Sequence, residues 1–222
     1  NYSTFKYIGS SATGNFLRWR KDLDAVLKFN PFIKEEFRSK IQRIHNLRLL
    51  KFKDQTYAIE DKLDCFFEDF EVNLGCIDAR RDPLYHLGAD IYLHPDFVRA
   101  RLAPEQRNDV LLTKMFFRNI GIKGGKIGGF AIEQLIIYFG NFEALLIKLS
   151  EGTPVHVDFS GRYSGPLSPI IISYPYSGLD NLAKIDPSDF ELIHSYAQRI
   201  QVSPELFLDD SFKTADIYEG KV

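Results

Sequence analysis

Two aspartates separated by one residue, Asp22 and Asp24, are the side chains of this sequence best suited to chemistry. They lie in a largely apolar run that ends at Phe29 and is typical of a β-strand. Because side chains alternate along a strand, both carboxylates belong to one face. Two such carboxylates repel one another unless a cation lies between them. The pair therefore predicts a site for two Mg²⁺ ions, which can clamp a nucleoside triphosphate and activate a hydroxyl.

A turn of small residues precedes this strand. The chain runs from Tyr7 and Ile8 into Gly9 and Ser10, which indicates a short strand followed by a tight turn, with Asn15 a few residues later. Such a turn lets backbone N–H groups approach phosphate oxygens closely. A lone Gly-Ser or a lone Asp-X-Asp is common in proteins. The hypothesis of a nucleotide site rests on finding both, each where a strand is expected.

The elements that must position these residues follow from hydrophobic periodicity. Residues 1–30 predict strand, turn and strand, and residues 31–48 predict an amphipathic helix. Residues 49–78 predict further strands, with a hairpin turned by Glu68 and Asp69, and residues 79–95 read as a polar loop. We therefore expect a mixed α+β first half.

The second half is expected to be helical. One helix should begin at Pro104 and end near Gly121, a second should run from residues 128–129 to Phe139, and a third should follow the cap residue Asn141. Residues 151–186 predict loop and strand, and further helices should begin at 187 and 204. The expected division is a first domain over 1–95 and a helical domain with a short strand-containing insertion over 96–222.

Composition restricts the class of protein. The chain has 222 residues, 45% of them hydrophobic, which is enough for a sizeable core. Its net charge of −2 excludes binding of nucleic acid through overall charge, so any such contact needs local basic groups. Candidates are Arg80-Arg81, Arg99-Arg101 and Arg118-Lys123-Lys126, although ordinary surface charge explains them equally well.

Two cysteines, Cys65 and Cys76, are too few for a disulfide scaffold, and no Cys/His spacing suggests zinc. An intracellular location is therefore expected. No apolar run approaches the roughly 18 residues of a membrane span, so no membrane partner is expected. The first residue is Asn1, not Met, which suggests that further residues precede it.

Longer segments carry a family resemblance. Residues 109–122 and 128–142, in this order after the Gly9-Ser10 turn and the Asp22–Asp24 pair, are similar to the central region of archaeal-type CCA-adding enzymes. These belong to the DNA polymerase β-type nucleotidyltransferase superfamily. The resemblance implies a nucleotidyltransferase palm with a mixed β-sheet, followed by a helical domain.

The resemblance also implies an activity. An enzyme of this type would transfer NMP from ATP or CTP to an RNA 3′ hydroxyl, with two Mg²⁺ ions bound by Asp22 and Asp24. Gly9 and Ser10, with Asn15 nearby, would contact the triphosphate, and Lys114 falls where the family has a lysine on the phosphates. The RNA could be tRNA or rRNA.

Several positions depart from the family pattern. The family's third carboxylate falls on Asn73, an amide that is a poorer Mg²⁺ ligand and cannot act as a general base. Thr13 and Asp180 stand where the family has arginines, and Lys123 stands where it has a tyrosine. His94 is either a ligand contact or, as we prefer, a loop histidine.

Another residue could replace the missing carboxylate. Glu71 shares a strand face with Asn73 by the period of two, so we include it with Asp22 and Asp24 as a metal ligand. Asp64 and Glu68 are weaker alternatives.

These departures leave three functions open. The first is an active RNA nucleotidyltransferase. The second is a catalytically degenerate member of the same fold, a pseudoenzyme that acts as a scaffold with protein partners in an RNA-processing or ribosome-related ribonucleoprotein. The third, ranked last, is synthesis of a nucleotide second messenger. The sequence leaves open whether the chain is catalytically active, its RNA acceptor, its base specificity and its oligomeric state.

Overall fold

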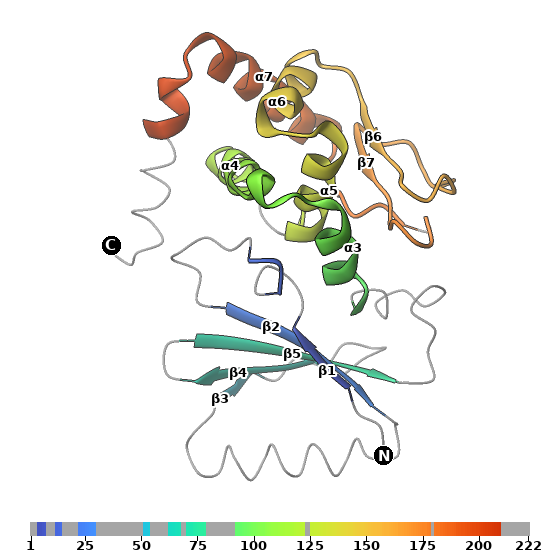
Figure 1. Cartoon of the computed structure of the whole chain (residues 1–222). Helices are drawn as coiled ribbons and strands as arrows, with labels where there is room; N and C mark the ends of the chain where they lie inside the picture. Colours follow the sequence, from blue (N-terminus) through green and yellow to red (C-terminus); the bar gives the residue numbers. More distant parts are fainter. Residues whose placement is uncertain are drawn as a thin grey trace. The chain divides into compact units, whose positions relative to one another are not determined.

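A computed structural model describes residues 4–7, 12–14, 22–29, 51–53, 62–67, 70–78, 92–122, 125–178 and 180–209 (Figure 1). For strands β2 to β5 it describes the backbone and its register. The chain divides into two compact units, Asn1–Phe97 and Val98–Val222, and each is presented by itself. The helix expected over 31–48 and the turn at Glu68 and Asp69 lie outside the described residues. The assignment of a palm to 1–95 and of a helical domain to 96–222 stays a prediction.

The first unit contains a five-stranded sheet, drawn in blue to teal in Figure 1. Its strands are β1 (Thr4–Tyr7), β2 (Asp22–Phe29), β3 (Lys51–Lys53), β4 (Lys62–Phe67) and β5 (Phe70–Asp78), arranged in the order β1-β2-β5-β4-β3. Strands β2 and β5 are parallel, and the other three neighbouring pairs are antiparallel. The predicted mixed sheet is confirmed, and β4 and β5 form the expected hairpin.

Helix α3 (His94–Arg101) was not predicted. The prediction of a polar loop over 79–95 is wrong at the C-terminal end of that range, because His94 is a helical residue and not a loop histidine. The physical reason is that Pro95 is compatible with a first helical turn, where Asp96 also suits the helix dipole. Within the first unit, Lys6 Nζ donates to Tyr92 O at 2.7 Å and to Asp96 Oδ2 at 2.5 Å, which ties β1 to the start of α3.

The second unit is mainly helical. It contains the 3₁₀ turn η3 (Pro104–Gln106) and the helices α4 (Arg107–Asn119), α5 (Gly129–Phe139), α6 (Phe142–Ser150) and α7 (Pro187–Val202). Strands β6 (Val155–Val157) and β7 (Ile170–Ile172) form a small parallel pair beside them (Figure 1). The predicted helices and the strands expected within residues 151–186 are present, except that Pro104 begins a 3₁₀ turn and the α-helix itself begins at Arg107.

Local signals set the helix ends. Gly140 ends α5 at a φ of +89°, a conformation that favours glycine. Asn141 then caps α6, because its Oδ1 accepts the N–H of Ala144 at 2.8 Å. Asp186 and Asp189 form a capping box at the start of α7. Of these signals, the sequence prediction used only the cap residue Asn141, although all of them lie within a few residues of a boundary.

Helix α5 is central to the core of the second unit. Every residue from Ala131 to Ile136 is buried, and the helix packs against α4, α6, β6 and β7. Leu135 and Ile136 are fully buried beside Leu145, Ile170 and Ile193. Burial on all sides is typical of such a central position, and in α5 it includes two polar residues, Glu133 and Gln134.

Membrane spans were sought among the described helices. None of them alone is long and apolar enough to cross a bilayer, and only α5 and α6 taken together, across a bend of 93°, reach that length and composition.

Candidate nucleotide and metal site

Strands β2 and β5 place the predicted metal ligands in register. Asp22 is paired with Glu71, and Asp24 is paired with Asn73. Paired residues on neighbouring strands share a face of the sheet, and positions two apart share it as well. The four residues therefore occupy adjacent positions on one face, although Glu71 and Asp22 are 49 positions apart in sequence.

The next strands extend the same face. Asp64 of β4 is paired with Asn73, and Lys53 of β3 is paired with Asp64. Asp64 thus has an oppositely charged residue on one side and lies two strands from Asp24. Glu71 instead has Asp22 as its register neighbour on one side and Phe66 on the other. The register brings Glu71, more closely than Asp64, to the aspartate pair.

The donor set suits divalent metal. Three carboxylates at adjacent positions on one sheet face have the oxygen chemistry that Mg²⁺ prefers. Adjacent strands lie about 4.8 Å apart, a spacing that one ion can bridge. Among the side chains that the structure describes, no group of three His, Cys, Asp or Glu is arranged to hold a metal.

The predicted phosphate cradle is only partly described. Gly9, Ser10 and Asn15 lie outside the described residues, as does Lys123. Thr13, half-buried, belongs to a short helical turn that ends at Gly14, where φ is +75°. The roles of the cradle residues stay predictions.

Lys114 lies in α4 beside the first residue of α5. A Cβ built on Gly129 would lie 3.7 Å from both Cε and Nζ of Lys114, an ordinary contact distance, so the lysine side chain lies against the start of α5. The preceding cap residue, Gly128, would meet nothing within 4 Å if it carried a Cβ. The start of α5 therefore combines an ammonium group, small residues and the positive end of a helix dipole. This chemistry suits a phosphate.

Asp180 lies at an exposed turn after β7. Its carboxylate accepts the N–H of Asn181 at 2.8 Å, and its backbone oxygen accepts the N–H of Tyr174 at 3.3 Å. Asn181 in turn accepts the N–H groups of Ile172 and Ala183, and it donates to Ile170 O. Asp180 thus starts a turn that fastens residues 181–183 to β7.

Asp158 was not singled out by the sequence. Its carboxylate accepts hydrogen bonds from the hydroxyls of Ser160 and Ser173, both at 2.6 Å, and from the backbone N–H groups of Ser160 and Tyr163. Burial alone would raise the pKa of this carboxyl, but the hydrogen bonds outweigh burial and hold the pKa well below its usual range. Asp158 fixes the loop that leaves β6 against the end of β7.

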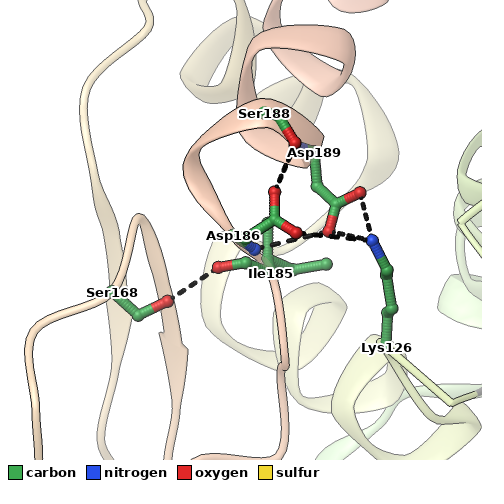
Figure 2. A network of polar contacts seen from close by, with 6 residues as sticks. All are labelled: Lys126, Ser168, Ile185, Asp186, Ser188 and Asp189. Carbon is green, nitrogen blue, oxygen red and sulfur yellow. Dashed lines mark hydrogen bonds and ion pairs between the residues drawn. The ribbon is translucent and has the colours of Figure 1, made fainter.

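Lys126 is the centre of an ion-pair network in the second unit (Figure 2). Its Nζ lies 2.5 Å from both carboxylate oxygens of Asp189 and 3.6 Å from Asp186 Oδ2. The hydrogen bond to Asp189 raises the pKa of Lys126. The Ser188 hydroxyl contributes most to lowering the pKa of Asp186 to about 2. Lys126, whose side chain is 45% exposed, is therefore a surface cation held in an ion pair with the start of α7.

Comparison with curated proteins supports the family resemblance. The chain is 26% identical over 190 residues to the CCA-adding enzyme of Methanothermobacter thermautotrophicus, covering 79% of this chain and 42% of that protein. It is 32% identical over 187 residues to the CCA-adding enzyme of Pyrobaculum islandicum, covering 79% and 44%. The chain thus spans less than half the length of these curated relatives. No protein-family model matches it.

Comparison with solved structures supports the fold. The Cid1 poly(U) polymerase with bound Mg 3′-dATP matches with a TM-score of 0.68 at 11% identity, covering 89% of this chain and 80% of that one. CdnC of E. coli MS115-1 with ATP matches with a TM-score of 0.64 at 17% identity, covering 98% and 78%. At these identities the matches show the fold. The predicted nucleotidyltransferase fold and the resemblance to archaeal CCA-adding enzymes are both confirmed.

Proposed function

Because the chain is related to the archaeal CCA-adding enzymes and has the fold of nucleotidyltransferases, we propose that it transfers NMP from ATP or CTP to the 3′ hydroxyl of an RNA. The observation that carries this proposal is the β2–β5 register, which places Asp22, Asp24 and Glu71 at adjacent positions on one sheet face. The acceptor is proposed to be tRNA or rRNA, and the reaction to take place inside the cell.

In this proposal Asp22, Asp24 and Glu71 hold two Mg²⁺ ions. When bound, the ions would supply Lewis-acid chemistry, lowering the pKa of the attacking hydroxyl and neutralising the triphosphate. Glu71 takes the place of the carboxylate that the family has at position 73. Its register neighbour is Asp22, whereas Asn73 is the neighbour of Asp24, so the ligand set is shifted by one pair along the strands.

The chain's own groups orient the nucleotide. The 3′ hydroxyl of the RNA gives its proton to water and its oxygen bonds to the α-phosphorus, while the bond from that phosphorus to the oxygen of the β-phosphate breaks and pyrophosphate leaves. Gly9 and Ser10 are proposed to contact the triphosphate with their backbone N–H groups. Lys114 is proposed as a further phosphate contact, supported by its approach to Gly129 at the start of α5. An ammonium group there stabilises negative charge as it moves to the leaving group.

The proposal is tested by incubating the chain with labelled ATP or CTP, Mg²⁺ and bulk RNA, and sequencing the RNA 3′ ends. Asp22→Ala and Asp24→Ala should each abolish incorporation. Glu71→Gln should reduce it strongly, whereas Asp64→Asn, the matched control two strands from Asp24, should leave most of it. If Asp64→Asn is the damaging variant, Asp64 is the third ligand and the assignment of Glu71 is wrong.

A degenerate, non-catalytic role is the second candidate, and Asn73 and Asp180 favour it. A protein of this kind would bind RNA or protein partners in a ribonucleoprotein without transferring nucleotides. Isothermal titration separates the two functions. Micromolar binding of ATP or CTP with Mg²⁺ that is lost in Asp22→Ala supports the enzyme. No binding at millimolar nucleotide supports the scaffold.

A further inference from the structure

The segment that leads into α5 is fastened by three contacts from two consecutive residues, two to residues 183 and 184 and one to the start of α7. Lys126 O accepts the N–H of Lys184 at 2.6 Å, and Ile127 forms an antiparallel bridge with Ala183. The third contact is the ion pair between Lys126 and Asp189. Figure 2 shows the lysine reaching across from its own segment to the two aspartates at the helix start.

The geometry of the Lys126–Asp189 ion pair suits it to hold the segment before α5 in place. The side chain of Asp189 is 8% exposed, and both of its oxygens lie at 2.5 Å from Lys126 Nζ. Asp189 also accepts the N–H of Asp186 at 3.3 Å in the capping box. A nearly buried carboxylate requires a compensating cation, so the lysine is held where the helix start places the acid.

The fastened segment leads directly into the start of α5, against which the proposed phosphate contact Lys114 lies. Gly128 and Gly129 follow Lys126 and Ile127 in the chain, and Gly129 lies against Lys114. A displacement of residues 126 and 127 therefore moves the start of α5 relative to Lys114. The groups of a binding site must be held within about 0.5 Å of their productive positions, so a displacement of this segment weakens binding.

We propose that the Lys126–Asp189 ion pair is the positioning device of the phosphate-binding start of α5, so that nucleotide affinity depends on two side chains that do not contact the nucleotide. The inference rests on the proposed function, because it assigns the ligand of that helix start. Lys126 and Asp189 are positioning residues and not catalytic ones. They link two segments that are distant in sequence, the α4–α5 connection and the start of α7.

Binding of ATP with Mg²⁺, measured by isothermal titration on the full chain, tests the proposal. Asp189→Asn keeps a capping oxygen but removes the charge, and Lys126→Met removes the cation. Each should weaken ATP binding by roughly five- to tenfold or more, the range of typical coupling between sites. Lys126→Arg, which retains the charge and reach, should restore affinity to near that of the wild type.

Two control variants separate positioning from general damage. Lys148→Met breaks an exposed ion pair with Glu151, 2.8 Å long, at the end of α6 and should leave ATP affinity unchanged. Ile193→Val weakens the core beside the buried face of α7, and it should lower the melting temperature without changing affinity. If Ile193→Val weakens ATP binding as much as Asp189→Asn does, the positioning role is refuted.

Hydrogen exchange provides a readout that needs no nucleotide. In Asp189→Asn, amides of residues 127–131 should exchange at least about tenfold faster than in the wild type, while those of α6 stay unchanged. Should Lys126→Met not fold, Asp189→Asn and Lys126→Arg still decide the question. Wild-type protein that does not bind ATP overturns the proposed function. Wild-type protein that binds ATP only as tightly as Asp189→Asn does overturns the present inference alone.

Discussion

The substitution Asn73→Asp tests the face of the sheet on which the proposed chemistry depends. Position 73 is paired with Asp24, so the new carboxylate would have an aspartate as its direct neighbour on β2. At about 5 Å, two like charges repel by about 1–3 kcal/mol for effective dielectric constants between about 80 and 20. The variant should therefore be less stable than the wild type by that amount when metal is removed with EDTA.

Magnesium should reverse this loss of stability. Two facing carboxylates bind a divalent cation better than one carboxylate and one amide, so millimolar Mg²⁺ should raise the unfolding free energy of Asn73→Asp more than that of the wild type. Urea denaturation with EDTA and with Mg²⁺ measures both effects. The same variant should increase NMP transfer by roughly 100-fold or more, because it places beside Asp24 a carboxylate that can accept the proton of the attacking hydroxyl, which the Asn73 amide cannot do.

An exchange of the two groups provides the control. The double variant Asp24→Asn with Asn73→Asp contains as many carboxylates on the face as the wild type, so its stability in EDTA should return towards the wild-type value. If Asn73→Asp is as stable as the wild type in EDTA, and Mg²⁺ affects both equally, positions 24 and 73 do not face one another and the reasoning fails.

Two further predictions concern the second unit. Asp158→Asn should cost about 2 kcal/mol at pH 7 in urea denaturation, because a carboxylate with four hydrogen-bond donors is replaced by an amide that cannot accept them all. The pKa of Asp158 is lower in the folded state, so its stabilising effect is present above the unfolded pKa of about 3.9 and is lost as the pH falls through the folded pKa. The difference in unfolding free energy between variant and wild type should therefore narrow below about pH 4. A difference that is constant with pH would refute the charged role. Gln134→Met should raise the unfolding free energy by about 1 kcal/mol, because Gln134 is fully buried and neither polar atom of its amide has a partner among the described residues; equal or lower stability would show that the amide is satisfied, for example by a buried water.

Most of the described secondary structure followed from local sequence signals. The periods of two and 3.6 residues predicted the strands and helices, and the cap residue Asn141 directly precedes the helix that it begins. Helix α3 was missed because a polar segment with a proline near its start is equally typical of a loop. Phe97 of this helix is buried, and its burial depends on tertiary packing that no local sequence pattern indicates.

The candidate site divides in the same way. Alternation of side chains along β2 is enough to predict that Asp22 and Asp24 share one face. Alternation does not tell which residue of another strand stands opposite them, so Glu71 and Asp64 were open alternatives. The β2–β5 register ranks Glu71 as the nearer of the two.

What the sequence alone determined about this protein is its set of elements, its likeness to archaeal CCA-adding enzymes and the aspartate pair. These depend on residues that are close in the chain or on order along it. Only the tertiary structure decided the pairing of Glu71 with Asp22, the ion pair between Lys126 and Asp189 and the four hydrogen bonds that Asp158 accepts. The physical reason is that these contacts join residues from separate segments. Side-chain period fixes the face on which a residue lies, while strand register and packing of the whole unit fix its partner.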